Sequence, residues 1–229
     1  MVVKFVYRIR FLEEASFHTC PKFLIYQLLW HHIKKLTCLW TKRLCQECSL
    51  QSQCIFYKIS GERFQFYPAV FVRRDLYVKT HYLPNDTMDI ELFLLGNIYI
   101  QQYIHGFFEQ LTQIHRVHVY VKEVQTSTLK EEMNHNIHFK LLTPTDWTCL
   151  DEQTQYYQDR YHVKVPKVQF EDITHRRVIH DRRIYRIDTK RLSYQGEIAE
   201  IRCKEISSVW LELGIGKWNF LGGGAIDAD

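Results

Sequence analysis

The sequence predicts an α+β protein in which one order of secondary-structure elements occurs twice. Residues 3–12 alternate apolar and basic side chains, which is typical of a half-buried strand, and residues 22–36 have the length and periodicity of a helix. Strand patterns within 70–96, a helical pattern at 97–114 and a strand pattern at 115–124 follow. The resulting order, β-α-β-β-α-β, is the split βαβ arrangement of a ferredoxin-like domain.

The first predicted helix has a defined beginning and an apolar side. Pro21 stands in its first turn, where proline is tolerated because the backbone N–H there has no partner within the helix. The apolar positions that we expect to face the core are Leu24, Leu28, Leu29, Ile33 and Leu36.

The second half of the chain repeats this order. Residues 125–136 are polar and lack periodicity, so we place the domain boundary there. Beyond it we expect a strand at 137–144, a helix at 151–162, two strands around a turn within 182–203 and a short helix at 206–214. We therefore predict two tandem ferredoxin-like, or RRM-like, domains at 1–125 and 136–229, with a cysteine-rich insert at 38–54 in the first.

Composition limits the classes of protein that fit. The 229 residues are 46% hydrophobic, so a packed core is expected. No apolar run approaches the roughly 18 residues of a membrane-spanning helix. The N-terminus also lacks the apolar segment of a signal peptide. We expect a cytoplasmic protein without membrane contact.

The net charge of +4 is unevenly distributed. Residues 15–46 contain five Lys or Arg and no acid, and residues 175–191 contain seven Lys or Arg against Asp181 and Asp188. Two basic segments on a nearly neutral chain indicate a polyanionic partner, although two solvated faces would give the same pattern.

Four of the seven cysteines fall within residues 38–54, in the spacing C-x6-C-x2-C-x5-C. A C-x2-C pair places two thiolates on one metal, and two more complete a tetrahedral site, so the spacing fits structural zinc. An iron–sulfur cluster and free thiols in a reducing cytosol are the alternatives. The predicted ligands are Cys38, Cys45, Cys48 and Cys54, while Cys20, Cys149 and Cys203 are expected to be packed thiols.

Five of the nine glycines lie within residues 214–224. A phosphate-binding P-loop is excluded because Lys217 is followed by Trp218, and a dinucleotide fingerprint is excluded because Asn219 stands at its third glycine position. Two interpretations remain. The segment is either a loop that lies against a sugar-phosphate backbone or a tight connection between a helix and a final strand.

The glycine pattern resembles the glycine-rich loop of the CRISPR-associated repeat-RNA endoribonucleases, a family within the repeat-associated RNA-binding proteins. Gly214, Gly216, Gly222 and Gly224 occupy its four glycine positions, with Lys217 between them, whereas Gly223 stands where the family usually has a bulky residue. Residues 139–144 ("FKLLTP"), 67–74, 84–96 and the cysteine segment resemble other parts of the family, so the likeness covers most of the chain.

The resemblance implies metal-independent RNA cleavage, in which a 2′-hydroxyl attacks the neighbouring phosphate and leaves a 2′,3′-cyclic phosphate. Such chemistry needs a general base and cations. The family's base comes from the first helix or the segment after it, and 41–45 contains no histidine. We prefer His31, which lies one helical turn from Lys34, over His32, which lies beside Leu28 and Leu29. The candidate catalytic residues are His31, His32, Tyr26 and Lys34. His18 is the next candidate, and two plain surface histidines on the helix are the alternative.

A run of arginines in the second domain is the candidate RNA-binding surface. Together with the glycine loop, it would grip the phosphates of an RNA stem and remain on the 3′ stem-loop of the product. The arginines are Arg176, Arg177, Arg182, Arg183 and Arg186. The expected partners are CRISPR repeat RNA or mature crRNA and the other subunits of an effector complex. A non-cleaving crRNA-binding subunit remains an alternative, and a zinc-ribbon protein that recognises other proteins is a more distant one.

Overall fold

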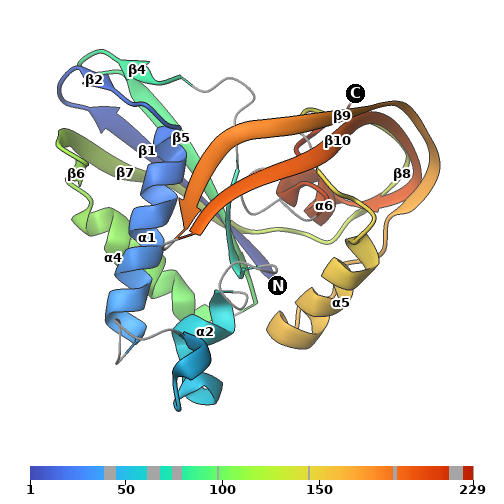
Figure 1. The fold of residues 1–229 in the computed structure, drawn as a ribbon, viewed down its shortest axis with the longest axis horizontal. Coiled ribbons are helices and arrows are strands. Elements are labelled where there is room, and N and C mark those ends of the chain that lie inside the picture. The colour runs from blue at the N-terminus through green and yellow to red at the C-terminus, as the bar shows by residue number, and fades with distance from the viewer. Residues whose placement is uncertain are drawn as a thin grey trace. The chain divides into compact units, whose positions relative to one another are not determined.

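The computed structural model describes residues 1–38, 45–60, 68–73, 79–96, 98–143, 145–187, 190–216 and 224–228 (Figure 1). The chain forms two compact units. The N-terminal unit consists mainly of Val3–Val72 and Tyr77–Ser127, and the C-terminal unit mainly of Thr128–Asp229. No helix in the described part of the chain is both long and apolar enough to cross a membrane.

The N-terminal unit is built on a five-stranded sheet in the order β3-β5-β1-β7-β6. Without the short edge strand β6, this is the strand order 2-3-1-4 of a ferredoxin-like domain. The strands are β1 (Val2–Phe11), β3 (Val70–Val72), β5 (Thr87–Leu95), β6 (Gln113–Ile114) and β7 (Val117–Thr128). A separate two-stranded sheet pairs β2 (Ala15–Ser16) with β4 (His81–Tyr82).

Two helices, α1 (Pro21–Thr37) and α4 (Gln101–Gln110), contact each other and the sheet. Tyr7 of β1 stacks on Phe108 of α4, with ring centroids 3.8 Å apart. The Tyr26 hydroxyl of α1 donates a hydrogen bond to the carbonyl oxygen of Val70 in β3. Between α1 and β3, the described residues form η1 (Cys45–Glu47), η2 (Gln51–Gln53) and α2 (Ile55–Ile59). The cysteine-rich insert itself remains a prediction.

The buried side of α1 differs from the predicted stripe. Leu29 and Ile33 are buried as expected, but Leu28 and Leu36 are 38% and 55% exposed. Tyr26 and Trp30, one turn apart, fill the core-facing side instead. Because these aromatic side chains bury far more surface than leucine does, they decide which side of the helix faces inward.

The second predicted helix also ends earlier than its pattern suggested. The segment 97–114 contains η3 (Ile98–Ile100) and α4, and its last residues form β6. His115 has a positive φ of 58° in the turn that joins β6 to β7. Ile114 pairs with Val117 across this turn. The backbone N–H and C=O groups of this segment therefore find hydrogen-bond partners in a sheet instead of in a longer helix.

The C-terminal unit has a four-stranded sheet in the order β11-β8-β10-β9. Numbered within the unit, this is 4-1-3-2, the same ferredoxin-like order as in the first unit read from the opposite edge. Its strands are β8 (Met133–Leu141), β9 (Gln169–Ile187), β10 (Lys190–Ser207) and β11 (Ile226–Ala228), and its helices are α5 (Leu150–Tyr161) and α6 (Ser208–Leu213). Tyr157 of α5 stacks on the fully buried Trp210 of α6. Both units therefore confirm the predicted fold class of two ferredoxin-like domains.

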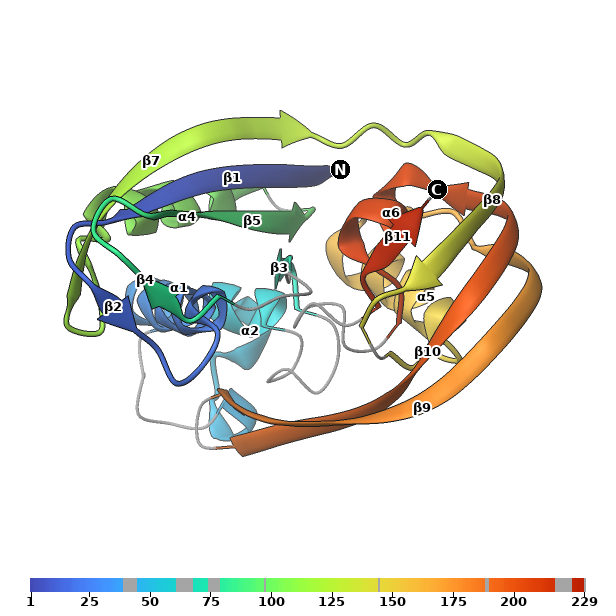
Figure 2. The same cartoon turned by 90° about the horizontal axis from the view of Figure 1, so that it is seen from above.

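The strands on both sides of the predicted domain boundary, and those of the second unit, are longer than expected. β7 continues to Thr128 and β8 begins at Met133, so only 129–132 separate them. β9 and β10 pair antiparallel over most of their length and lie side by side in both views (Figures 1 and 2). Their polar, charged sequence lacks the clear apolar alternation of a half-buried strand, so the length of the hairpin could not be predicted.

Candidate functional site

The helix α1 carries all four candidate catalytic residues, but in different environments. Tyr26 is 1% exposed, and its hydroxyl donates a 2.6 Å hydrogen bond to the carbonyl oxygen of Val70. Its ring also meets that of Trp30 edge to face. The Tyr26 side chain therefore connects α1 to β3 and stabilises the fold.

The two adjacent histidines of α1 differ in exposure. His31 is exposed to solvent, whereas the ring of His32 lies edge-on to Phe107 of α4, with centroids 5.5 Å apart. Burial, with smaller contributions from Lys35 and His31, lowers the pKa of His32 below its ordinary value. Since neighbouring residues on a helix point about 100° apart, one histidine packs between helices while the other faces water.

Lys34 lies one turn beyond His31, at the end of α1. Its ammonium group is 5.7 Å from the centre of the Phe56 ring, a cation–π arrangement that fixes the position of the charge. Residues three apart on a helix share a face, so His31 and Lys34 lie on the same side of α1. A neutral imidazole can accept a proton, and a nearby ammonium can stabilise a developing negative charge.

The described part of the glycine segment is tightly anchored. Gly216 and Gly224 have positive φ values of 91° and 64°. A Cβ atom at Gly216 would come within 2.5 Å of the carbonyl oxygen of Asp146, and one at Gly224 would overlap the carbonyl oxygen of Ile215. Only glycine fits these two close backbone approaches. Gly214 also has a positive φ, directly after α6.

Two threonines, Thr143 within "FKLLTP" and Thr145 directly after it, hold this segment in place. The Thr145 hydroxyl donates to the carbonyl oxygen of Ile215 at 2.8 Å, and the Thr143 hydroxyl accepts from the backbone N–H of Ala225 at 2.8 Å. The two ends of the segment thus meet beside the strand that opens the C-terminal unit. Lys217 and Gly222 lie outside the described residues, as does Gly223.

Strand β9 carries all five candidate arginines. Arg176 donates two hydrogen bonds to the carboxylate of Glu197, at 2.8 and 3.1 Å, and its guanidinium lies 5.6 Å from the Trp147 ring centre. Arg177 is exposed. For Arg182, Arg183 and Arg186 the structure describes the backbone only, within the hairpin of β9 and β10.

Three of the four predicted metal ligands line the same pocket. Cys38, Cys48 and Cys54 line a pocket of about 220 Å³, while Cys45 is not among its lining residues. Thiol groups suit zinc chemically. Over the described residues, however, no group of three or more His, Cys, Asp or Glu side chains is arranged to hold a metal ion. As they stand, these side chains do not form a zinc site, and the metal remains a prediction from the spacing.

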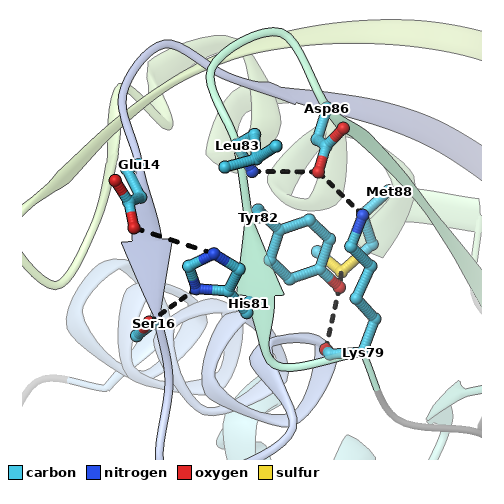
Figure 3. Close-up of polar contacts among 8 residues, drawn as sticks. All are labelled: Glu14, Ser16, Lys79, His81, Tyr82, Leu83, Asp86 and Met88. Carbon is cyan, nitrogen blue, oxygen red and sulfur yellow. Dashed lines mark hydrogen bonds and ion pairs between the residues drawn. The ribbon is translucent and has the colours of Figure 1, made fainter.

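A cluster of polar side chains surrounds His81, and no pattern in the sequence predicted it (Figure 3). The Ser16 hydroxyl lies 2.9 Å from His81 Nδ1, and Glu14 Oε1 lies 3.7 Å from its Nε2. Lys79 and Asp86 form an ion pair of 2.7 Å beside it. Ser16 and His81 are 65 residues apart, so no local motif could reveal that β2 and β4 bring them together.

A second unforeseen cluster joins β1, α4 and β7. The Tyr7 hydroxyl is 2.8 Å from Nδ1 of His105, which is 3.1 Å from the Glu123 carboxylate. Burial, followed by the charges of Glu123 and Glu109, raises the pKa of Tyr7 well above its ordinary value. Tyr7 therefore remains a hydrogen-bond donor at every physiological pH, and this cluster ties the second helix to the sheet.

The fold and these residues define a two-domain, ferredoxin-like protein with basic side chains on a long hairpin. No family model matches the sequence, and no curated protein matches it. Solved structures do resemble it over their full length. They include a CRISPR-associated protein Cas6 with 11% identity, 100% of both chains covered and a TM-score of 0.54.

Two further structures are similarly close. The product complex of the Thermus thermophilus Cas6 named TTHB231 has 9% identity and a TM-score of 0.56, with 100% of both chains covered. A RAMP protein binding different RNA substrates has 14% identity and a TM-score of 0.51, with 99% of both chains covered. The chain therefore shares the double ferredoxin-like fold of these proteins.

Proposed function

We propose that this protein is a CRISPR RNA processing endoribonuclease that binds repeat RNA and cuts it without a catalytic metal. The observation that carries this proposal is the full-length likeness to Cas6 folds, two of which are described as product complexes. The glycine segment and the arginines of β9 add independent support from the residues themselves. The protein would act in the cytoplasm, stay on the 3′ stem-loop of the crRNA and join other effector subunits.

In the proposed reaction, His31 is the general base. Its imidazole takes the proton from the 2′-hydroxyl next to the scissile phosphate, and the 2′-oxygen then attacks phosphorus. The bond from phosphorus to the 5′-oxygen breaks, and that oxygen takes a proton from solvent water, which gives a 2′,3′-cyclic phosphate and a 5′-hydroxyl, while His31 later returns its proton to solvent. Lys34 would stabilise the extra charge on the phosphate. The exposure of His31 and its position one turn from Lys34 support these roles.

A non-cleaving crRNA-binding subunit is the second candidate function. The observation in its favour is that two of the four candidate catalytic residues are engaged within the N-terminal unit, since Tyr26 is buried against β3 and His32 is partly buried against Phe107. This leaves His31 and Lys34 to carry the chemistry. Both candidate functions require the same binding of repeat RNA and differ only in cleavage.

Repeat RNA with a 2′-deoxy substitution at the cleaved nucleotide tests the proposal. The wild-type protein should cut the all-ribose RNA into a product with a cyclic phosphate and bind the deoxy RNA equally well without cutting it. Tight binding of both RNAs without cleavage would favour the non-cleaving subunit. Cleavage of the deoxy RNA would contradict attack by the 2′-hydroxyl.

A further inference from the structure

A pocket in the C-terminal unit contains a flat, fixed guanidinium group. It has a volume of about 230 Å³ and lies between residues 145–148, which lead into α5, and the hairpin of β9 and β10. Arg176 enters it from β9. On one side its guanidinium lies over the ring of Trp147, which is only 8% exposed.

The carboxylate of Glu197 fixes the plane of this guanidinium. It accepts hydrogen bonds from both Nε and Nη2 of Arg176, at 2.8 and 3.1 Å. A bidentate pair of this kind sets both the position and the plane of the group. The Arg176 side chain nevertheless remains 55% exposed, so part of its surface is open to solvent.

The backbone of β9 explains how Arg176 reaches this position. His175, directly before it, has a positive φ of 50°. The pairing of β9 with β10 is irregular here, between the pairs Ile198–Arg177 and Glu200–Thr174. Irregularities of this type redirect the side chains that follow them and are common next to binding sites.

The remaining walls distinguish between possible ligands. Arg176 is one cation among two carboxylates, those of Asp146 and Glu197, so the charges of the lining argue against a phosphate group. Asp146 is held in place because one of its oxygens accepts from both the backbone N–H and the hydroxyl of Thr148. Fixed carboxylate acceptors match the amino groups on the edge of a nucleobase.

An apolar side chain completes the setting. Val178 lines the same pocket and is 51% exposed. Unpaired RNA bases stack on aromatic rings and on arginine planes, with hydrogen bonds along their edges. A flat guanidinium backed by Trp147, with Val178 beside it and acceptors around it, offers each of these contacts.

We propose that this pocket binds one unpaired nucleobase of the RNA, stacked on the exposed face of Arg176. The proposal rests on the RNA binding proposed above and adds the place at which a single base is held. Arg176 is then a stacking surface for a base, and contact with the phosphates falls to other basic residues of the hairpin.

Single abasic nucleotides, introduced one at a time along the unpaired segments of the repeat RNA, test this proposal. For the wild-type protein, one position should weaken binding by about 5- to 140-fold, the range expected for one stacked base. Arg176→Lys keeps the charge but removes the plane and the two parallel hydrogen bonds, so the abasic substitution should then have almost no further effect. Arg202→Lys, an exposed arginine on β10, is the matched control and should keep the wild-type penalty.

The outcomes separate this proposal from the function on which it rests. Binding of intact repeat RNA without any abasic-sensitive position would overturn the base pocket alone, as would a penalty that survives in Arg176→Lys. Binding of free nucleoside monophosphates that depends on Arg176, without an abasic-sensitive position in RNA, would also overturn it. Failure to bind repeat RNA at all would overturn the proposed function and the pocket together.

Discussion

The hydroxyl of Tyr26 donates a 2.6 Å hydrogen bond to the carbonyl oxygen of Val70, and both residues are buried. This bond connects α1 to an edge strand of the N-terminal sheet. Tyr26→Phe keeps the ring and leaves that carbonyl oxygen without its donor. We expect the free energy of unfolding to fall by about 1–3 kcal/mol, as measured by urea denaturation.

The same variant separates a structural role from a catalytic one. If Tyr26 only holds α1, cleavage by Tyr26→Phe should stay within about twofold of wild type at temperatures where both are folded. Unchanged stability together with a large loss of cleavage would instead make Tyr26 part of the chemistry.

The positive φ of Gly216 and its close approach to the backbone of Asp146 require glycine at this position. Gly216→Ala would place a methyl group against the carbonyl oxygen of Asp146 at an unfavourable positive φ. We expect the free energy of unfolding to fall by about 1–3 kcal/mol. Gly106→Ala, in α4 with nothing within 4 Å of the added atom, is the matched control and should gain about 0.5–1 kcal/mol. Equal effects of the two substitutions would contradict the close approach.

His32 should make stability depend on pH. Its folded-state pKa is below the ordinary 6.5, mainly because the ring is partly buried against α4. The unfolded chain therefore takes up this proton at a higher pH than the folded chain does. The free energy of unfolding should fall as pH drops from 6.5 through the lower folded-state pKa and level off below it.

Urea denaturation between about pH 5 and 7.5 measures this effect. His32→Gln should remove that part of the pH dependence, while His115→Asn, at an exposed turn, should retain it. Identical pH profiles for His32→Gln and wild type would show that His32 does not titrate differently in the folded protein.

The cysteine spacing predicts about one zinc ion per chain, measurable by atomic emission on protein purified without chelator. Cys48→Ser and Cys54→Ser, which change thiols of the same pocket, should lose the metal. Cys20→Ser should keep it, because Cys20 lies at the start of α1 and outside that pocket. If the purified wild-type protein contains neither zinc nor iron, the metal-site prediction is wrong and Cys38, Cys45, Cys48 and Cys54 are ordinary thiols.

Local patterns predicted most elements of the fold. The alternation in residues 3–12 corresponds to β1, Pro21 stands at the first position of α1, and both halves contain the predicted β-α-β-β-α-β order of elements. The prediction that Leu28 and Leu36 face the core was wrong. The larger aromatic side chains of Tyr26 and Trp30 are buried instead and determine which side of α1 faces inward.

Contacts between distant segments could not be read from the sequence. Trp147 and Arg176 meet because β9 is irregular at His175, and Ser16 meets His81 across two short paired strands. Neither pair has a spacing that marks it in a single sequence. The arginine run was visible as charge, but the partner of Arg176 was not, because Glu197 lies on the neighbouring strand.

The single-turnover cleavage rate of repeat RNA in excess EDTA tests the central claim most directly. Zinc content is measured in parallel, because a chelator could also remove a structural metal. We expect the wild type and the control His115→Asn to cut and leave a 2′,3′-cyclic phosphate. His31→Ala should bind the RNA equally well and cut it about 100- to 10,000-fold more slowly, the usual contribution of a general base. Cleavage by His31→Ala at the wild-type rate, or none by the wild type, would contradict the account.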